Sequence, residues 1–373
     1  MTALVCALLI LAPMAGRCAA GAPTNGPAYA RPQTIREGDL TVRVGETVQI
    51  LPASATKCAY VGAKKLPNGD LIACLPWPRT GRPIQSARSS DGGRTWRPAV
   101  SRLSDDGGAS WYDGPTPICD NYLALTNGSV IGFDFPRQPN ALWTFNADGT
   151  TGVLRRTRLA AGEDASLFAY QHTMVQLADG RILATSQVKR PGDVKSRVPI
   201  HVSADNGLTW RFLAHAALDP SPHDRQEGFT EPRLLRRADG ALLCFLRTAN
   251  PDTAKRNGYT YEGLEVVRSR DHGQTWSAPA TVVPRGVYPD AVAMRNGVIA
   301  VSYGRPGNNV VFSLDGGDTW IADLRVADTI RAPDCGFYNA LLEVEPGTLL
   351  LAYSTGEHLN EPTAVVLGTF LHV

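Results

Sequence analysis

The 373-residue sequence predicts an all-β fold, a six-bladed β-propeller that is closed by an N-terminal strand in the last blade. Three observations support this prediction. A hairpin with a Gly-containing turn recurs six times, a second turn of fixed composition recurs four times, and almost no segment has the periodicity of an amphipathic helix. Six units of four short antiparallel strands are what a six-bladed propeller requires.

The six hairpins lie 50 to 60 residues apart along the chain. Each turn places Asn-Gly, Asp-Gly or Pro-Gly between two apolar runs, and such turns form readily because Gly tolerates positive φ. The turn glycines are Gly69, Gly128, Gly180, Gly240, Gly297 and Gly347. We expect each hairpin to supply the inner strands of one blade.

A second turn with the spacing S-x-D-x-G-x-T-W follows the hairpin in four units. Its copies are SSDGGRTW (89–96), SADNGLTW (203–210), SRDHGQTW (269–276) and SLDGGDTW (313–320). The Asp can accept backbone N–H groups, the Gly can adopt the left-handed conformation and the Trp can pack on the sheet. We therefore interpret these octets as structural turns of the outer hairpins rather than as catalytic sites.

Two related segments differ from this pattern. SDDGGASW (104–111) follows the first octet after only a few residues, and we interpret it as a chance match or an insertion after blade one. FNADGTTG (145–152) is interpreted as a decayed copy in blade two.

The N-terminal residues predict export and ring closure. Residues 1–22 have an apolar core too short to span a bilayer, followed by small residues, which is typical of a signal peptide. We expect residues 23–39 to be flexible and residues 40–373 to form a single propeller domain. The sixth unit lacks an outer hairpin, so LTVRVGETVQIL (40–51) should complete blade six and remove an open sheet edge. The mature protein is expected to be secreted or periplasmic and monomeric.

The composition argues against several classes of partner. A net charge of +2 provides no basic field for nucleic acid, and no segment of the mature chain is long and apolar enough to span a membrane. Neither C-x-x-C nor H-E-x-x-H occurs, so we expect no metal and no cofactor. Cys58, Cys119 and Cys335 precede the inner strands of neighbouring blades and could form one disulfide or remain thiols.

Polar and aromatic residues near the ring axis are the candidates for a ligand site, because the inner strands of a propeller line its central channel. The inner strands supply Tyr60, Asp120, His172, Glu231, Asp290 and Tyr338. Residues that follow the second strands supply Arg79, Arg247, Arg305, Glu357 and His358.

The octets are Asp boxes, and together with the six hairpins they make the chain similar to the sialidase (neuraminidase) superfamily of six-bladed propellers. The resemblance covers nearly the whole mature chain. TEPRLLRRADGALLCFLR (230–247) is similar to the sialidase segment that contributes a Glu and an Arg of the carboxylate-binding triad, which implies these roles for Glu231 and Arg247.

Two further segments extend the resemblance. VSYGRPG (301–307) is similar to the segment that contributes another Arg of the triad, here Arg305. GFYNALLEVEPGTLLLAY (336–353) is similar to the segment with the nucleophilic Tyr, here Tyr338.

The resemblance implies a secreted exo-glycosidase that hydrolyses a terminal, anionic sugar from a glycan. A neutral Tyr nucleophile suits a sugar with a carboxylate on its anomeric carbon, because that carboxylate would repel an Asp or Glu nucleophile. Glu231 would act as the base for the phenol of Tyr338, whose pKa near 10 otherwise keeps it protonated at neutral pH. Arg247 and Arg305 would bind the carboxylate of the sugar.

Blade one departs from the sialidase pattern. Its inner strand reads AYVGAKKL (59–66) where sialidases have Arg-Ile-Pro, which leaves Arg79 as a replacement arginine. The loop RTGRPIQS (79–86) contains no carboxylate for acid/base catalysis, and the nearest candidates are Asp290, Asp120 and His172. Tyr60 would contribute to substrate binding.

These departures leave alternatives open. The same propeller could carry other carbohydrate chemistry, as an exo-arabinanase, a rhamnosidase or a uronate-directed lyase that uses His172 as a base. It could also be a glycan-binding propeller without catalytic activity.

Overall fold

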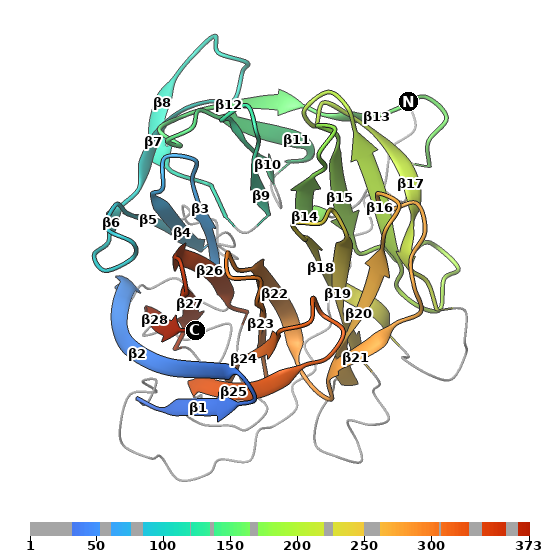
Figure 1. Cartoon of the computed structure of the whole chain (residues 1–373). Coiled ribbons are helices and arrows are strands. Elements are labelled where there is room, and N and C mark those ends of the chain that lie inside the picture. The colour runs from blue at the N-terminus through green and yellow to red at the C-terminus, as the bar shows by residue number, and fades with distance from the viewer. Residues whose placement is uncertain are drawn as a thin grey trace, which may run out of the picture.

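We analysed a computed structural model of the chain, which describes residues 32–52, 61–75, 85–119, 121–134, 138–164, 171–219, 227–249, 262–305, 307–327, 338–355 and 365–373. These residues form β-strands and connecting turns, and the strands are grouped in six sheets around a central axis (Figure 1). The predicted six-bladed propeller is thus confirmed. Among the described residues there is no helix with the length and apolarity needed to cross a membrane.

The blades follow one another in chain order, and in each blade the strands are ordered from the inner to the outer edge. Blade one contains β3 (Gly62–Lys65), β4 (Leu71–Leu75), β5 (Gln85–Ser89) and β6 (Arg97–Pro98). Blade two contains β9 (Tyr122–Ala124), β10 (Val130–Asp134), β11 (Gln138–Phe145) and β12 (Thr151–Arg156). Blade three contains β14 (Gln171–Gln176), β15 (Ile182–Ser186), β16 (Val198–Ser203) and β17 (Thr209–Ala217), and the short strand β13 (Arg158–Leu159) pairs with β17.

The last three blades repeat this order. Blade four contains β18 (Gly228–Arg236), β19 (Leu242–Ala249), β20 (Glu262–Ser269) and β21 (Ala280–Val283). Blade five contains β22 (Val287–Ala293), β23 (Ile299–Gly304), β24 (Asn308–Ser313) and β25 (Ile321–Ala327). Blade six contains β26 (Ala340–Glu345), β27 (Thr348–Ser354), β28 (Val366–His372) and β2 (Leu40–Leu51).

The N-terminal strand closes the ring, as predicted. β2 pairs antiparallel with β28, from Arg43 opposite His372 to Leu51 opposite Val366, and Figure 1 shows the N-terminal strands beside the C-terminal ones. The start of the domain needs a correction, because β1 (Thr34–Glu37) pairs with β2 and so extends the sheet into the segment that we expected to be flexible. The proposed signal peptide lies outside the described residues.

The Asp boxes join neighbouring blades. In the box of blade one, Thr95 donates its N–H to Asp91 Oδ1 at 2.9 Å and Trp96 Nε1 donates to the Gly93 carbonyl at 2.8 Å. Gly93 has φ of +94°, and a Cβ there would lie 2.9 Å from Leu350 of blade six. The corresponding glycines of the other three boxes lie against Leu142 of blade two, Leu183 of blade three and Leu243 of blade four. Each of these turns therefore packs on the preceding blade, which gives the recurring spacing of its residues a structural reason.

The segment 104–111 is a fifth Asp box, so its interpretation as a chance match was wrong. Gly108 donates its N–H to Ser104 Oγ at 2.7 Å, and Ser110 donates its N–H to Asp106 Oδ1 at 2.9 Å, as in the other boxes. The alternative interpretation, an insertion, is correct: β7 (Val100–Ser104) and β8 (Tyr112–Pro115) form a hairpin that pairs with β12 at the outer edge of blade two. Among the described residues a Cβ at Gly108 would meet only Trp111, so no described strand of a neighbouring blade lies beneath this box.

A disulfide joins the first two blades. Cys74 on β4 is bonded to Cys119, just before β9, and both residues are buried. The sequence left open whether Cys58, Cys119 and Cys335 form one disulfide or remain thiols; Cys119 forms a disulfide, but its partner Cys74 was not among the candidates. Cys58 and Cys335 lie outside the described residues. Cys74 faces blade two because alternate residues of β4 point toward that neighbour, where they join the same apolar cluster as Cys119.

Candidate active site

One position recurs on the inner strands of blades four, five and six. Glu231, Tyr288 and Tyr338 each lie nine residues before the hairpin glycine of their blade. In β18 and β22 the pairing register shifts around this position, which marks a β-bulge. The backbone there has positive φ, +48° at Glu231 and +50° at Tyr288, which is unfavourable for residues other than Gly and is common at functional sites.

Glu231 is the centre of the described site. Its carboxylate accepts hydrogen bonds from Arg247 Nη1 at 3.0 Å, from the Tyr288 backbone N–H at 2.8 Å and from the Tyr338 hydroxyl. Its own N–H donates to Gln187 Oε1 at 2.9 Å. Glu231 is only 8% exposed, so these partners replace the water that a buried carboxylate loses.

The charges of the site determine which groups are ionised. Burial acts to raise the pKa of Glu231, but the Arg247 charge, the Tyr338 hydrogen bond and the Arg305 charge together hold that pKa below its usual value. Burial and the negative charge of Glu231 raise the pKa of Tyr338 well above its usual value, against the effect of the two arginines. At neutral pH the pair is therefore a carboxylate that accepts a hydrogen bond from a protonated phenol.

Two arginines and a second tyrosine surround this pair. Burial acts to lower the pKa of Arg247, but the charge of Glu231 outweighs it, so this pKa is raised and the group stays cationic. The guanidinium carbon of Arg305 lies 5.9 Å from the centroid of the Tyr338 ring, within the range of a cation–π contact. The ring of Tyr288 lies 4.3 Å from that of Tyr338, centroid to centroid. The structure thus brings together four of the predicted residues: Glu231, Arg247, Arg305 and Tyr338.

Asp290 has a different environment from the one predicted. It is 2% exposed, forms an ion pair with Arg233, and accepts the backbone N–H groups of Ala291 at 2.7 Å and Leu341 at 2.9 Å. These contacts tie together β18, β22 and β26, as expected for a structural carboxylate. The bulge in β22 puts Tyr288, and not Asp290, at the position equivalent to Glu231.

The side chains of the other predicted residues lie outside the described part of the structure, so their roles stay predictions. The backbone of His172 belongs to β14, at a shift of register like those in β18 and β22, and its side chain is outside the description. Tyr60, Arg79, Asp120, Glu357 and His358 also lie outside the described residues. Within the part of the chain that is described, no group of three or more His, Cys, Asp or Glu side chains is placed to hold a metal ion.

Comparisons with known proteins agree with the fold. A family model of the BNR/Asp-box repeat matches residues 267–278, which include the box at 269–276. The structure is similar to an unknown-function protein from Dyadobacter fermentans (TM-score 0.64, 18% identity, 89% of this chain and 99% of that one). It is also similar to the Hadza microbial sialidase Hz136 (TM-score 0.56, 18% identity, 90% of this chain and 70% of that one). A third similar structure is Penicillium chrysogenum alpha-L-arabinanase complexed with arabinobiose (TM-score 0.57, 17% identity, 88% of this chain and 99% of that one).

The chain is thus a six-bladed propeller with Asp boxes, and its fold is similar to that of a sialidase and of an arabinanase. No curated protein sequence matches it significantly. At 17–18% identity, the similarity to solved structures describes the architecture of this propeller and leaves its reaction open.

Three residues that contact the site of this propeller were missed in the sequence. Tyr288 could have been found, because it has the same distance from its hairpin glycine as Glu231 and is likewise followed by Pro. Gln187, which follows β15, and Glu227, which precedes β18, carry no such signal. Their contacts with Glu231 and Arg247 depend on how blades three and four pack together.

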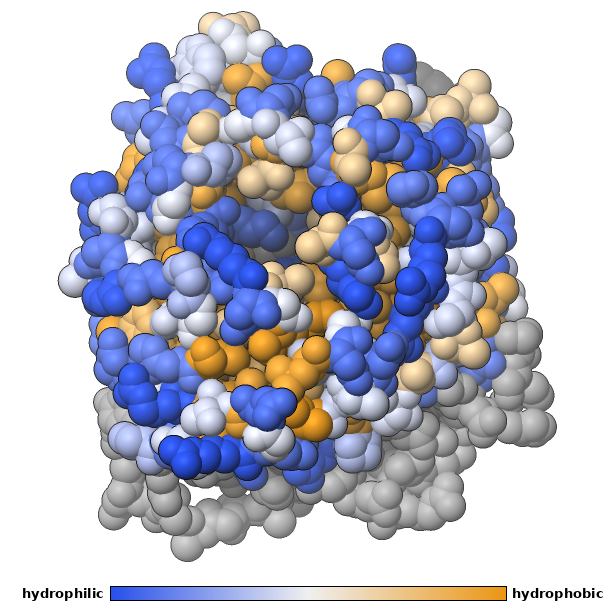
Figure 2. All heavy atoms as spheres, viewed as in Figure 1, coloured by the Kyte–Doolittle hydropathy of each residue, from blue (hydrophilic) through white to orange (hydrophobic). Residues whose placement is uncertain are grey.

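The surface of the propeller has hollows of two kinds. Viewed along the axis, the face is hollowed near its middle, with hydrophilic residues around the hollow (Figure 2).

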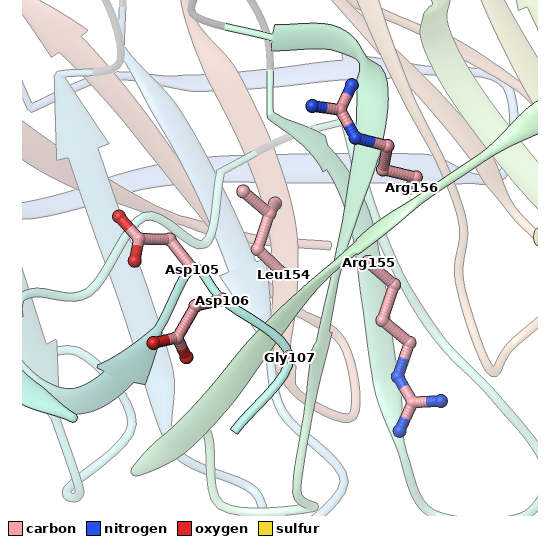
Figure 3. A pocket seen from close by; sticks show the side chains of 6 residues that line it. All are labelled: Asp105, Asp106, Gly107, Leu154, Arg155 and Arg156. Carbon is pink, nitrogen blue, oxygen red and sulfur yellow. The ribbon is translucent and has the colours of Figure 1, made fainter. Parts of the chain in front are cut away.

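A separate pocket of about 470 Å³ lies between the fifth Asp box and β12 on blade two, lined by Asp105, Asp106, Gly107, Leu154, Arg155 and Arg156 (Figure 3). Asp106 is already engaged in its turn and the two arginines point in opposite directions, so we assign no chemistry to this pocket.

Proposed function

We propose that this propeller is an exo-acting glycoside hydrolase that removes a terminal sugar with an anionic group, using Tyr338 as nucleophile and Glu231 as its base. The observation that carries the proposal is the hydrogen bond between the Tyr338 hydroxyl and the Glu231 carboxylate, with Arg247 and Arg305 beside it. A neutral nucleophile flanked by cations is suited to an anomeric centre that carries a carboxylate.

The proposed reaction proceeds in two displacements. The Tyr338 oxygen attacks the anomeric carbon while its proton passes to Glu231, and the glycosidic bond breaks. The leaving oxygen takes a proton from an acid, for which Asp120 and His172 remain the predicted candidates. Water then attacks the tyrosyl-linked sugar and gives a proton to the conjugate base of that acid, Glu231 returns its proton to the Tyr338 oxygen, and the free sugar leaves.

The environment of Tyr338 favours a concerted proton transfer. An unperturbed phenol costs about 4 kcal/mol to ionise at pH 7, and burial beside Glu231 raises that cost because it raises the pKa of Tyr338. Arg247 and Arg305 act in the opposite direction and stabilise negative charge on the phenol oxygen as it forms. The proton therefore leaves as the bond to carbon forms, with Glu231 already in hydrogen-bond contact.

We further propose that the protein is exported. The apolar N-terminal stretch followed by small residues is typical of a signal peptide, and the disulfide between Cys74 and Cys119 suits an oxidising compartment. A glycan outside the cytoplasm is then the expected substrate.

A panel of fluorogenic glycosides tests the proposal. The purified protein should release the fluorophore from a sialoside or a glucuronide, and Tyr338→Phe should abolish this release. Tyr353→Phe is the matched control, because the Tyr353 hydroxyl contacts Thr369 within blade six. Release only from an arabinofuranoside or a rhamnoside, or a product with the ultraviolet absorbance of a new double bond, would overturn the proposal.

A further inference from the structure

Arg247 is held between two carboxylates. Its Nη1 donates to Glu231 Oε1 at 3.0 Å and its Nη2 donates to Glu227 Oε2 at 3.3 Å. The two carboxylates differ in exposure, because the Glu231 side chain is 9% exposed and that of Glu227 is 39% exposed. Arg247 thus has one buried partner, Glu231, and one partner that is exposed to solvent, Glu227.

The backbone of Glu227 is fixed by the neighbouring blade. Its carbonyl accepts the N–H of Ser196 at 2.9 Å, and Phe229 donates its N–H to the Ser196 carbonyl at 3.3 Å. Between them, Gly228 has φ of +78° and lies so close to Ser196 that a Cβ would come within 2.3 Å of the Ser196 carbonyl oxygen. Only Gly fits there, and this close approach holds Glu227 beside Arg247.

The position of Glu227 affects any anion that approaches Arg247. A carboxylate binds a guanidinium most strongly when it accepts two parallel N–H bonds, and here Nη1 and Nη2 both already donate to carboxylates of the protein. The negative charge of Glu227 also repels a second carboxylate brought to Nη2. With Glu227 in place, the charges of Glu227, Glu231, Arg247 and Arg305 sum to zero.

We propose that Glu227 determines the selectivity of this site: it engages Nη2 of Arg247, and the carboxylate of the sugar competes with it for this group. This inference rests on the proposed function, since it names the group with which the anionic sugar exchanges. A neutral sugar gains nothing from the exchange and leaves the contact between Glu227 and Arg247 intact. A terminal ulosonate or uronate therefore binds to Arg247 when the carboxylate of the sugar takes the place of the Glu227 carboxylate.

Glu227→Gln provides the test, because it keeps the shape and an acceptor oxygen but removes the charge. Calorimetric titration with N-acetylneuraminic acid and with glucuronic acid should give affinities about tenfold higher for the variant than for the unaltered protein, and unchanged affinities for the methyl esters of both acids. Glu345→Gln is the matched control, since Glu345 is also bound to an arginine, Arg94 at 2.8 Å, but on the exposed side of the first Asp box. The affinities of the Glu345→Gln variant for both acids and both esters should equal those of the unaltered protein.

Three results would overturn the inference: no gain for either acid, an equal gain for acids and esters, or no binding of any probe to either protein. Turnover separates this inference from the proposed function. If the unaltered protein cleaves a sialoside or a glucuronide but the variant binds the acids no more tightly, hydrolysis stands and the role of Glu227 fails. If the variant gains affinity for an acid but neither protein cleaves any glycoside, the role of Glu227 stands and hydrolysis fails.

Discussion

The rings of Tyr288 and Tyr338 lie against each other, with their centroids 4.3 Å apart and their planes inclined by 35°. Tyr288 lies on the inner strand of blade five and Tyr338 just before that of blade six, and the backbone N–H of Tyr288 also donates to Glu231 at 2.8 Å. Tyr288 therefore contacts both members of the proposed nucleophile–base pair. A substitution of Tyr288 should alter the orientation of the Tyr338 hydroxyl without removing any reacting group.

Replacement of Tyr288 tests this positioning role. Tyr288→Ala removes an aromatic contact worth about 0.5–1.5 kcal/mol beyond burial, so we expect kcat to fall about two- to thirteenfold with little change in KM. Tyr288→Phe keeps the ring and should retain kcat. Both variants are assayed well below their unfolding temperatures, because a large buried ring is lost in the Ala variant. An equal loss in the Phe variant would show that the Tyr288 hydroxyl itself takes part.

The buried ion pair between Arg233 and Asp290 predicts a loss of stability rather than of chemistry. Asp290→Asn removes the charge that Asp290 provides to the buried Arg233, and breaking such a pair typically costs about 3–5 kcal/mol. The free energy of unfolding, measured with denaturant, should therefore fall by about 3–5 kcal/mol. The kcat of Asp290→Asn, measured at low temperature, should fall far less than that of Tyr338→Phe. Adding Arg233→Met should recover part of the loss. A loss of turnover in a variant with unchanged stability would restore Asp290 as a catalytic candidate.

The fold was predictable because its signals are local. A hairpin glycine and an Asp box each act within a few residues, and the six repeats of the hairpin fix the number of blades. Asp290 shows where local reasoning fails: the sequence predicted it as an inner-strand candidate, but the bulge at Tyr288 and Pro289 puts Tyr288, and not Asp290, at the position equivalent to Glu231. The contact of Glu227 with Arg247 depends on the close approach of Gly228 to Ser196, which joins two blades and leaves no pattern in the sequence.

The Asp boxes should differ in their contribution to stability. Asp205 accepts the N–H of Thr209 at 2.8 Å in a turn whose Trp210 is fully buried, whereas the fifth box, built around Asp106, has no described strand of a neighbouring blade beneath it. We expect Asp205→Ala to lower the free energy of unfolding by about 2 kcal/mol or more, and Asp106→Ala by less than about 1 kcal/mol. Thermal and denaturant unfolding of both variants measure the difference. Equal losses would mean that the turn hydrogen bonds, and not the packing on the preceding blade, dominate.

The disulfide between Cys74 and Cys119 should stabilise the junction of blades one and two. It closes a loop with a sequence separation of 45 residues, for which removal of the crosslink costs about 2–4 kcal/mol. Adding a reductant during denaturant unfolding should therefore lower the midpoint for the unaltered protein. A Cys74→Ser/Cys119→Ser variant should start from the lower midpoint and show no response to reductant. A response of the double variant would point to another crosslink.

Histidine burial on blade three predicts that stability falls in acid. His201 on β16 is fully buried, and burial, followed by the nearby charge of His215, lowers its pKa to about 4. In the unfolded chain its pKa returns to about 6.5, so between these values the unfolded state binds a proton that the folded state does not. The contribution of neutral His201 is thus fully present above pH 6.5 and is lost as the pH falls toward 4, by about 3 kcal/mol in total.

His201→Phe should weaken the pH dependence of the free energy of unfolding between pH 4 and 6.5, whereas His272→Asn, at an exposed turn, should leave it unchanged. A pH dependence unchanged in His201→Phe would assign the acid sensitivity to other groups, with His215 the first to examine because its pKa is lowered by burial and by Arg197.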